Sequence, residues 1–89
     1  MLFVRIDIKG GDNMKAEHEE QYRLLGLKIG YYRKLKGFTQ EALAEKIGKT
    51  ANFLGSAEAP NVQRTISLDT LFDIAKVLDV PPHKFFMED

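Results

Sequence analysis

The sequence contains no cysteine and no tryptophan among its 89 residues. The absence of cysteine excludes disulfide bridges, cysteine-ligated zinc fingers and thiol catalysis. No apolar run approaches the roughly 18 residues that a membrane-spanning helix needs. The first nine residues are too short for a secretory signal and carry interleaved charges at Arg5, Asp7 and Lys9. We therefore expect a cytoplasmic protein without a membrane segment.

The sequence also has no net charge at neutral pH, because 13 basic side chains balance 13 acidic ones. The charges are nevertheless segregated along the chain. Residues 21–66 carry eight basic and three acidic side chains, a net charge of +5, whereas residues 1–20 carry −2 and residues 67–89 carry −3. A basic segment between acidic ends is typical of a protein that contacts phosphates, and chance segregation on a solvated surface is the alternative. The length, with 44% hydrophobic residues, indicates one small globular domain.

The stretch from Thr39 to Glu58 predicts two short helices joined by a tight turn. Thr39 and Thr50 each stand directly before a helical pattern, where a hydroxyl accepts a hydrogen bond from a free backbone N–H. Gly48 stands just past the first helix, where a left-handed backbone costs other residues about 1 kcal/mol. The second helix is expected over residues 51–57, with Phe53, Leu54 and Ala57 as its inward positions.

Further helices are expected on both sides of this stretch. A long helix should begin near residues 14–17 and end at Lys36, with Gly37 as its stop, and Gly26 and Gly30 within it favour close approach of another helix. Ser67 can cap a later helix, and Pro82 suits the first turn of a short fifth helix that runs through residue 86. The inward residues expected of the later helix are Leu68, Leu71, Phe72, Ala75 and Leu78. The fold class is therefore all-α, with five helices around one core.

Residues 1–13 form an N-terminal extension to a domain expected over residues 14–89. Apolar and other residues alternate from Leu2 to Lys9, which predicts a short β-strand. A lone strand must pair with another chain, pack as an edge, or fray. The alternative is that Met14 is the true start and the preceding residues are incidental.

The run R-K-L-K-G-F-T-Q-E-A-L-A-E-K-I-G, from Arg33 to Gly48, resembles the phage repressor and Cro type of helix-turn-helix domain, also called the xenobiotic-response-element family. The resemblance continues through Thr50, Leu54 and Glu58 and covers about residues 24–86. It implies a repressor-like fold and a sequence-specific regulator of transcription that binds double-stranded DNA. The chain departs from the family after Glu58, where the usual glycine-containing turn is missing and the loop is about two residues longer.

By this resemblance, the helix over residues 50–57 enters the DNA major groove. Asn52 is the first candidate for base recognition, because its amide can bond bidentately to adenine. Thr39 and Gln40 would hold phosphates at a helix start. Phe53 faces either a sugar or the core or a partner, and the loop residues Gln63 and Arg64 are either phosphate contacts or solvated. The complete candidate set is Thr39, Gln40, Thr50, Ala51, Asn52, Phe53, Ser56, Gln63 and Arg64. The resemblance also implies a structural, partly buried ion pair between Arg33 and Glu58.

Catalysis and cofactor binding are not expected. His18 and His83 are isolated in the sequence, and no second ligand follows either one at metal-binding spacing. One reading helix contacts few base pairs, so we expect a homodimer on a pseudo-palindromic site. The rival hypothesis is a protein-interaction module, such as an antitoxin or a scaffold subunit. It rests on the small side chains of Ala51, Gly55 and Ser56, which would make poor base contacts.

Overall fold

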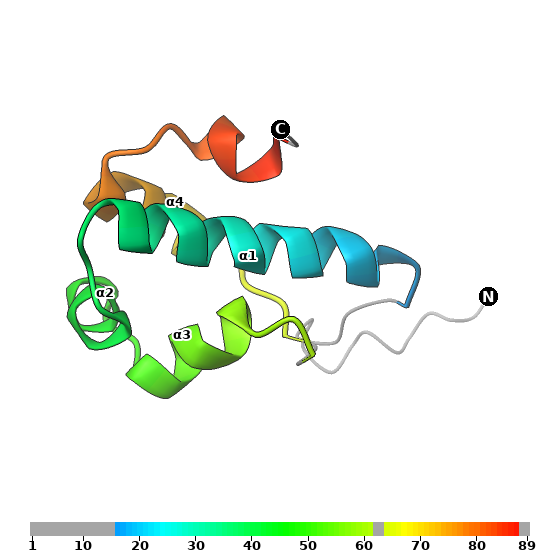
Figure 1. Cartoon of the computed structure of the whole chain (residues 1–89), viewed down its shortest axis with the longest axis horizontal. Helices are drawn as coiled ribbons and strands as arrows, with labels where there is room; N and C mark the ends of the chain where they lie inside the picture. Colours follow the sequence, from blue (N-terminus) through cyan, green and yellow to red (C-terminus); the bar gives the residue numbers. More distant parts are fainter. Residues whose placement is uncertain (1–15, 62–63, 88–89) are drawn as a thin grey trace.

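The computed structural model describes residues 16–61 and 64–87, which contain four α-helices, two 3-10 helices and no strand. The elements, in chain order, are η2 (Ala16–His18), α1 (Glu19–Leu35), α2 (Gln40–Ile47), α3 (Ala51–Glu58), α4 (Leu68–Leu78) and η3 (Pro82–Phe86). In Figure 1, the long helix α1 lies between η3 above and α3 below. The all-α class is confirmed. The expected strand and the boundary after residue 13 lie outside the described residues.

The three predicted helix caps are present. The Oγ1 atoms of Thr39 and Thr50 accept hydrogen bonds from the backbone N–H groups of Ala42 and Phe53, each at 3.0 Å. Ser67 Oγ accepts one from the Thr70 N–H at 3.1 Å. Gly48 ends α2 in the left-handed region with φ of 72°. These local interactions define both ends of the turn that joins α2 to α3.

A single core joins all four α-helices and η3. Each helix contributes fully buried apolar side chains, and the largest of them are Ile29, Leu43, Leu54, Leu71, Ile74, Leu78 and Phe85. The rings of Tyr32 and Phe85 meet edge to face with their centroids 5.3 Å apart, which anchors η3 on α1. The core therefore fixes α3 against the long central helix.

The glycines of α1 set how closely α3 can approach. A Cβ atom at Gly26 would overlap with the carbonyl oxygen of Ala57, and one at Gly30 would lie 3.2 Å from Glu58 Oε1. The neighbour that the two glycines were expected to admit is therefore α3, whose last turn rests directly on the α1 backbone.

Two expectations about the C-terminal half are corrected. Leu68 and Phe72 do not face inward, since they are 61% and 49% exposed. The buried stripe of α4 runs instead through Thr70, Leu71, Ile74, Ala75 and Leu78. Helical spacing alone placed Leu68 and Phe72 within the buried stripe, but they lie at its edge and face solvent. The fifth helix is a five-residue 3-10 helix, too short to build an α-helical ladder, and the Lys84 N–H bonds to the Pro81 carbonyl.

Candidate nucleic-acid interface

The start of α3 is open to solvent. Thr50 and Asn52 are exposed there, while Ala51 and Ser56 are half-buried. Because Thr50 Oγ1 already bonds the Phe53 N–H, its hydroxyl holds the first turn in place. Asn52 is the exposed amide side chain in this turn, and one amide N–H can donate to adenine N7 while the amide oxygen accepts from adenine N6.

Gln40 lies over the middle of α3. A Cβ atom at Gly55 would be 3.5 Å from Gln40 Oε1, which is an ordinary van der Waals contact, so the amide of Gln40 lies over Gly55. Gln40 Nε2 donates a hydrogen bond to Glu58 Oε1 at 3.1 Å. The side chain thus ties the first turn of α2 to the end of α3. A phosphate contact by Gln40 remains a prediction. Because the side chain bonds to Glu58, the group of Gln40 that would contact a phosphate is its backbone N–H at the start of α2.

Arg33 and Glu58 form the ion pair that the family resemblance implied. Arg33 Nε and Nη2 donate to the two carboxylate oxygens of Glu58 at 2.7 and 2.9 Å, and Arg33 Nη1 donates to the Phe38 carbonyl at 2.8 Å. The side chains are only 8% and 10% exposed. The hydrogen bond to Glu58 raises the pKa of the Arg33 guanidinium above its ordinary value. With Gln40, this pair joins α1, α2 and α3 in one polar network.

Phe53 carries two cations on its ring. Lys49 Nζ lies 5.3 Å from the ring centroid, and Arg64 Cζ lies 5.0 Å from it. The ring is half-buried and packs against the core, which is one of the two alternatives considered for it, and a contact with a DNA sugar stays a prediction. Gln63 lies outside the described residues. Lys49 was missed by the sequence reasoning, although a basic residue directly before a helix cap was a usable signal.

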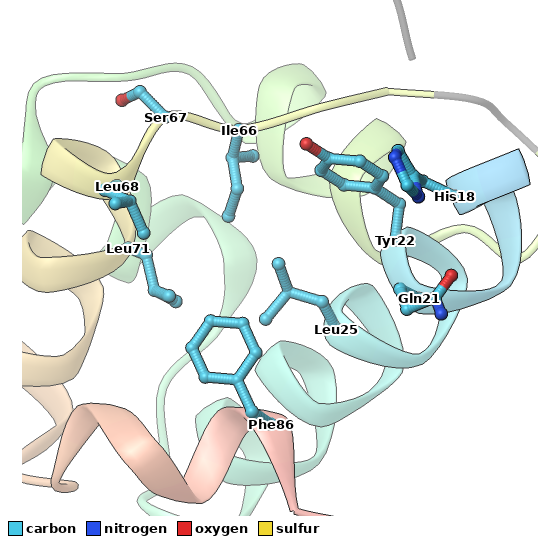
Figure 2. A pocket seen from close by; sticks show the side chains of 9 residues that line it. All are labelled: His18, Gln21, Tyr22, Leu25, Ile66, Ser67, Leu68, Leu71 and Phe86. Atoms are coloured by element: carbon cyan, nitrogen blue, oxygen red, sulfur yellow. The ribbon is translucent and has the colours of Figure 1, made fainter. Parts of the chain in front are cut away.

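A pocket of about 340 Å³ opens elsewhere, between α1, the start of α4 and η3. Figure 2 shows Tyr22, Leu25, Leu71 and Phe86 around this space. The described residues of the lining are mainly apolar and include no acidic side chain. Within residues 16–61 and 64–87, no group of three or more histidine or acidic side chains could hold a metal ion.

The arrangement of capped α2, tight turn and capped α3 agrees with a comparison against protein families. The family model described as helix-turn-helix matches residues 29–85. The chain belongs to the helix-turn-helix family. Its resemblance to the Cro and repressor type is confirmed, and the match extends beyond the two helices of the motif to η3.

Known relatives of this helix-turn-helix chain are regulators. The transcriptional regulator SinR of Bacillus subtilis is 38% identical over 65 residues, which are 73% of this chain and 58% of SinR. A solved structure of SinR in complex with DNA has a TM-score of 0.64 and 38% identity, covering 71% of this chain and 98% of that one. The restriction-modification controller protein C.AhdI of Aeromonas hydrophila has a TM-score of 0.72 and 30% identity, covering 79% and 99%. The chain thus spans little more than half the length of SinR.

Proposed function

We propose that this helix-turn-helix protein is a sequence-specific regulator of transcription that binds double-stranded DNA and acts in the cytoplasm without catalysing a reaction. The observation that carries the proposal is the capped and exposed start of α3, where Asn52 projects from a helix held rigidly on α1 and α2. A rigid helix start is what major-groove reading requires, because base contacts need fixed geometry. The described relatives are named as transcriptional regulators and one is solved with DNA, which supports this function.

The individual roles follow from position. Asn52 reads a base edge, Thr39 and Thr50 approach phosphates beside their helix caps, and Arg64 contacts the backbone from the loop after α3. Half-buried Ala51 contributes an apolar contact, such as one to a thymine methyl group. Phosphate contacts position the domain, whereas the Asn52 contact specifies the sequence.

The test is fluorescence anisotropy of the protein with random duplex and with DNA from its own upstream region, in a salt series. We expect binding that weakens steeply with salt and is at least about a thousandfold tighter on one sequence. Asn52→Ala should then lose about 1–3 kcal/mol of discrimination at one base pair. His83→Ala is the control, because His83 is exposed on η3, on the other side of α1 from α3 in Figure 1. If neither duplex binds at low salt, the DNA function is refuted.

A homodimer is part of this proposal. The exposed apolar side chains of α4, of η3 and of the residue after η3 form what we term the α4–η3 surface, defined by Leu68, Phe72, Phe86 and Met87. This surface adjoins the pocket in Figure 2, which Leu68 and Phe86 also line. A second copy placed here would remove a contiguous apolar area from water. The exposed side chains of Leu27, Tyr31 and Leu35 on α1 are the competing surface.

Protein binding is the second candidate function. The observation that favours it is the outward face of α3, where Ala51, Gly55 and Ser56 are half-buried and supply no long polar side chain. Absence of DNA binding in the anisotropy test, with the fold intact by circular dichroism, would favour this alternative.

A further inference from the structure

The Phe53 ring is an unusual feature of the candidate interface because it gathers cations from two separate segments. Lys49 belongs to the turn before α3, and Arg64 belongs to the loop between α3 and α4. Both place their charged groups within 5.3 Å of the same ring centroid. Aromatic faces attract cations, so the ring can orient two flexible side chains that would otherwise sample many rotamers.

Neither cation has a carboxylate partner within the part of the chain that the structure describes. The ion pairs found there join His18 to Glu17, Arg23 to Glu20 and Arg33 to Glu58. Lys49 and Arg64 are exposed, and within residues 16–61 and 64–87 their side-chain interactions are those with the ring. The ring satisfies no N–H donor in the way an oxygen does, so the two side chains keep their hydrogen-bonding capacity for a ligand. Two positive charges, each within 5.3 Å of one ring centroid, favour an anion beside them.

The location specifies which anion fits. Lys49 directly precedes the Thr50 cap, and Phe53 lies on the first turn of α3, the helix whose exposed start carries Asn52. A duplex that places a base edge at Asn52 brings its sugar–phosphate backbone alongside the same helix start. The helix dipole favours negative charge at this end. The backbone phosphodiester is therefore the anion that this position can reach.

We propose that Lys49 and Arg64, gathered on the Phe53 ring, form a clamp for neighbouring phosphates of the DNA strand that runs beside α3. Phe53 is the positioning residue of this clamp, and Lys49 and Arg64 are its phosphate ligands. The clamp rests on the proposed function and adds to it a coupling between the turn before α3 and the loop after it. Because phosphates carry no sequence information, the clamp raises affinity for every duplex alike.

The experiment measures the salt dependence of duplex binding by the full chain and its variants. Each phosphate contact contributes about 0.9 to the slope of log affinity against log salt. Lys49→Met and Arg64→Met should each lower the slope by about 0.9, and their combination by about 1.8. When the salt rises from 50 to 200 mM, the affinity of the wild type should therefore fall by a factor about twelve times larger than the factor for the double variant. Lys84→Met, which removes an exposed cation from η3, is the matched control and should leave the slope unchanged.

Variants of Phe53 separate the clamp from two independent cations. Phe53→Leu keeps both charges and an apolar side chain, so the slope should fall only if the ring positions the cations. When combined with Phe53→Leu, Lys49→Met and Arg64→Met should have little further effect on the slope. The separate variant Phe53→Tyr keeps the ring face and should show the wild-type slope. A proton NMR spectrum of the unbound protein adds a check that needs no DNA. The side-chain methylene signals of Lys49 and Arg64 should lie upfield in the wild type and return to ordinary positions in Phe53→Leu.

The possible failures are distinct. A wild-type slope in Phe53→Leu, or ordinary methylene shifts in the wild type, would overturn the positioning role of the ring. If Lys49→Met and Arg64→Met both behave like Lys84→Met, the clamp itself is refuted while the proposed DNA function stands. If the wild type binds no duplex at low salt, both the proposed function and the clamp are refuted.

Discussion

Removing the charge of Glu58 should destabilise the fold strongly, because it leaves the Arg33 guanidinium buried without its counter-charge. Glu58→Gln is the most informative change, since it keeps the side-chain shape. The Glu58 carboxylate accepts three hydrogen bonds, two from Arg33 at 2.7 and 2.9 Å and one from Gln40 at 3.1 Å. It also stands at the C-terminal end of α3, where the helix dipole disfavours a negative charge. Arg33 is therefore required to hold the carboxylate there.

The magnitude follows from these contacts. A hydrogen bond to a charged group contributes about 1.5–3 kcal/mol, and removal of one partner of a buried pair costs about 3–5 kcal/mol. The amide oxygen of the variant still accepts one hydrogen bond, and Arg33 keeps its hydrogen bond to the Phe38 carbonyl at 2.8 Å. We therefore expect Glu58→Gln to lower the free energy of unfolding by about 3 kcal/mol, the lower end of the range for a broken buried pair. For a domain of this size that corresponds to a fall in Tm of at least about 12 °C. Arg33→Met should cost about 3–5 kcal/mol.

Urea denaturation followed by circular dichroism measures these free energies of unfolding. The pair of Arg23 and Glu20 is the matched control, because it makes the same two-pronged contact at 2.7 and 3.1 Å on the exposed face of α1. Glu20→Gln should lower the unfolding midpoint only slightly, and far less than Glu58→Gln does, because the pair is exposed and Glu20 only adds a favourable charge in the first turn of α1. Arg33→Met combined with Glu58→Gln should cost clearly less than the sum of the single changes. A cost below about 1 kcal/mol for Glu58→Gln, or costs that add within about 0.5 kcal/mol, would refute the reasoning.

Three further changes test the packing and the assembly. Gly26→Ala should destabilise the fold by about 1–3 kcal/mol in thermal unfolding, because its methyl group would overlap with the Ala57 carbonyl oxygen; an unchanged Tm would contradict the close approach of α1 and α3. Gly55→Ala should stabilise it by about 0.5–1 kcal/mol, since the new methyl group has room beside Gln40, and a lower Tm would show that this space is overestimated. Phe86→Asp should convert the proposed dimer to a monomer in light scattering, whereas a wild-type mass would exclude Phe86 of the α4–η3 surface as the contact.

The elements of the fold could be predicted from the sequence because their signals are local. Thr39, Thr50 and Ser67 each cap a helix through a hydrogen bond to a backbone N–H three residues ahead, so the residue and its partner are close in the sequence. Gly48 takes its left-handed backbone for an equally local reason. The pairing of Arg33 with Glu58, residues far apart in the chain, was accessible only through the resemblance to a family.

The tertiary structure decided which side chains meet. Helical spacing placed Leu68 and Phe72 inside, but the position of the neighbouring helices leaves them exposed. No sequence pattern indicated that Gln40 would reach Glu58 across Gly55, because that contact depends on the crossing of α2 and α3.

The sequence by itself thus determined the four α-helices, three of their caps and the turn that presents α3, since these depend on backbone geometry and near neighbours. Lys49 and Arg64 precede and follow α3 in the sequence, and only the tertiary structure brought both against one Phe53 ring. Contacts of this kind depend on where the core holds each helix. Packing many side chains at once fixes that position, and spacing along the chain does not encode it.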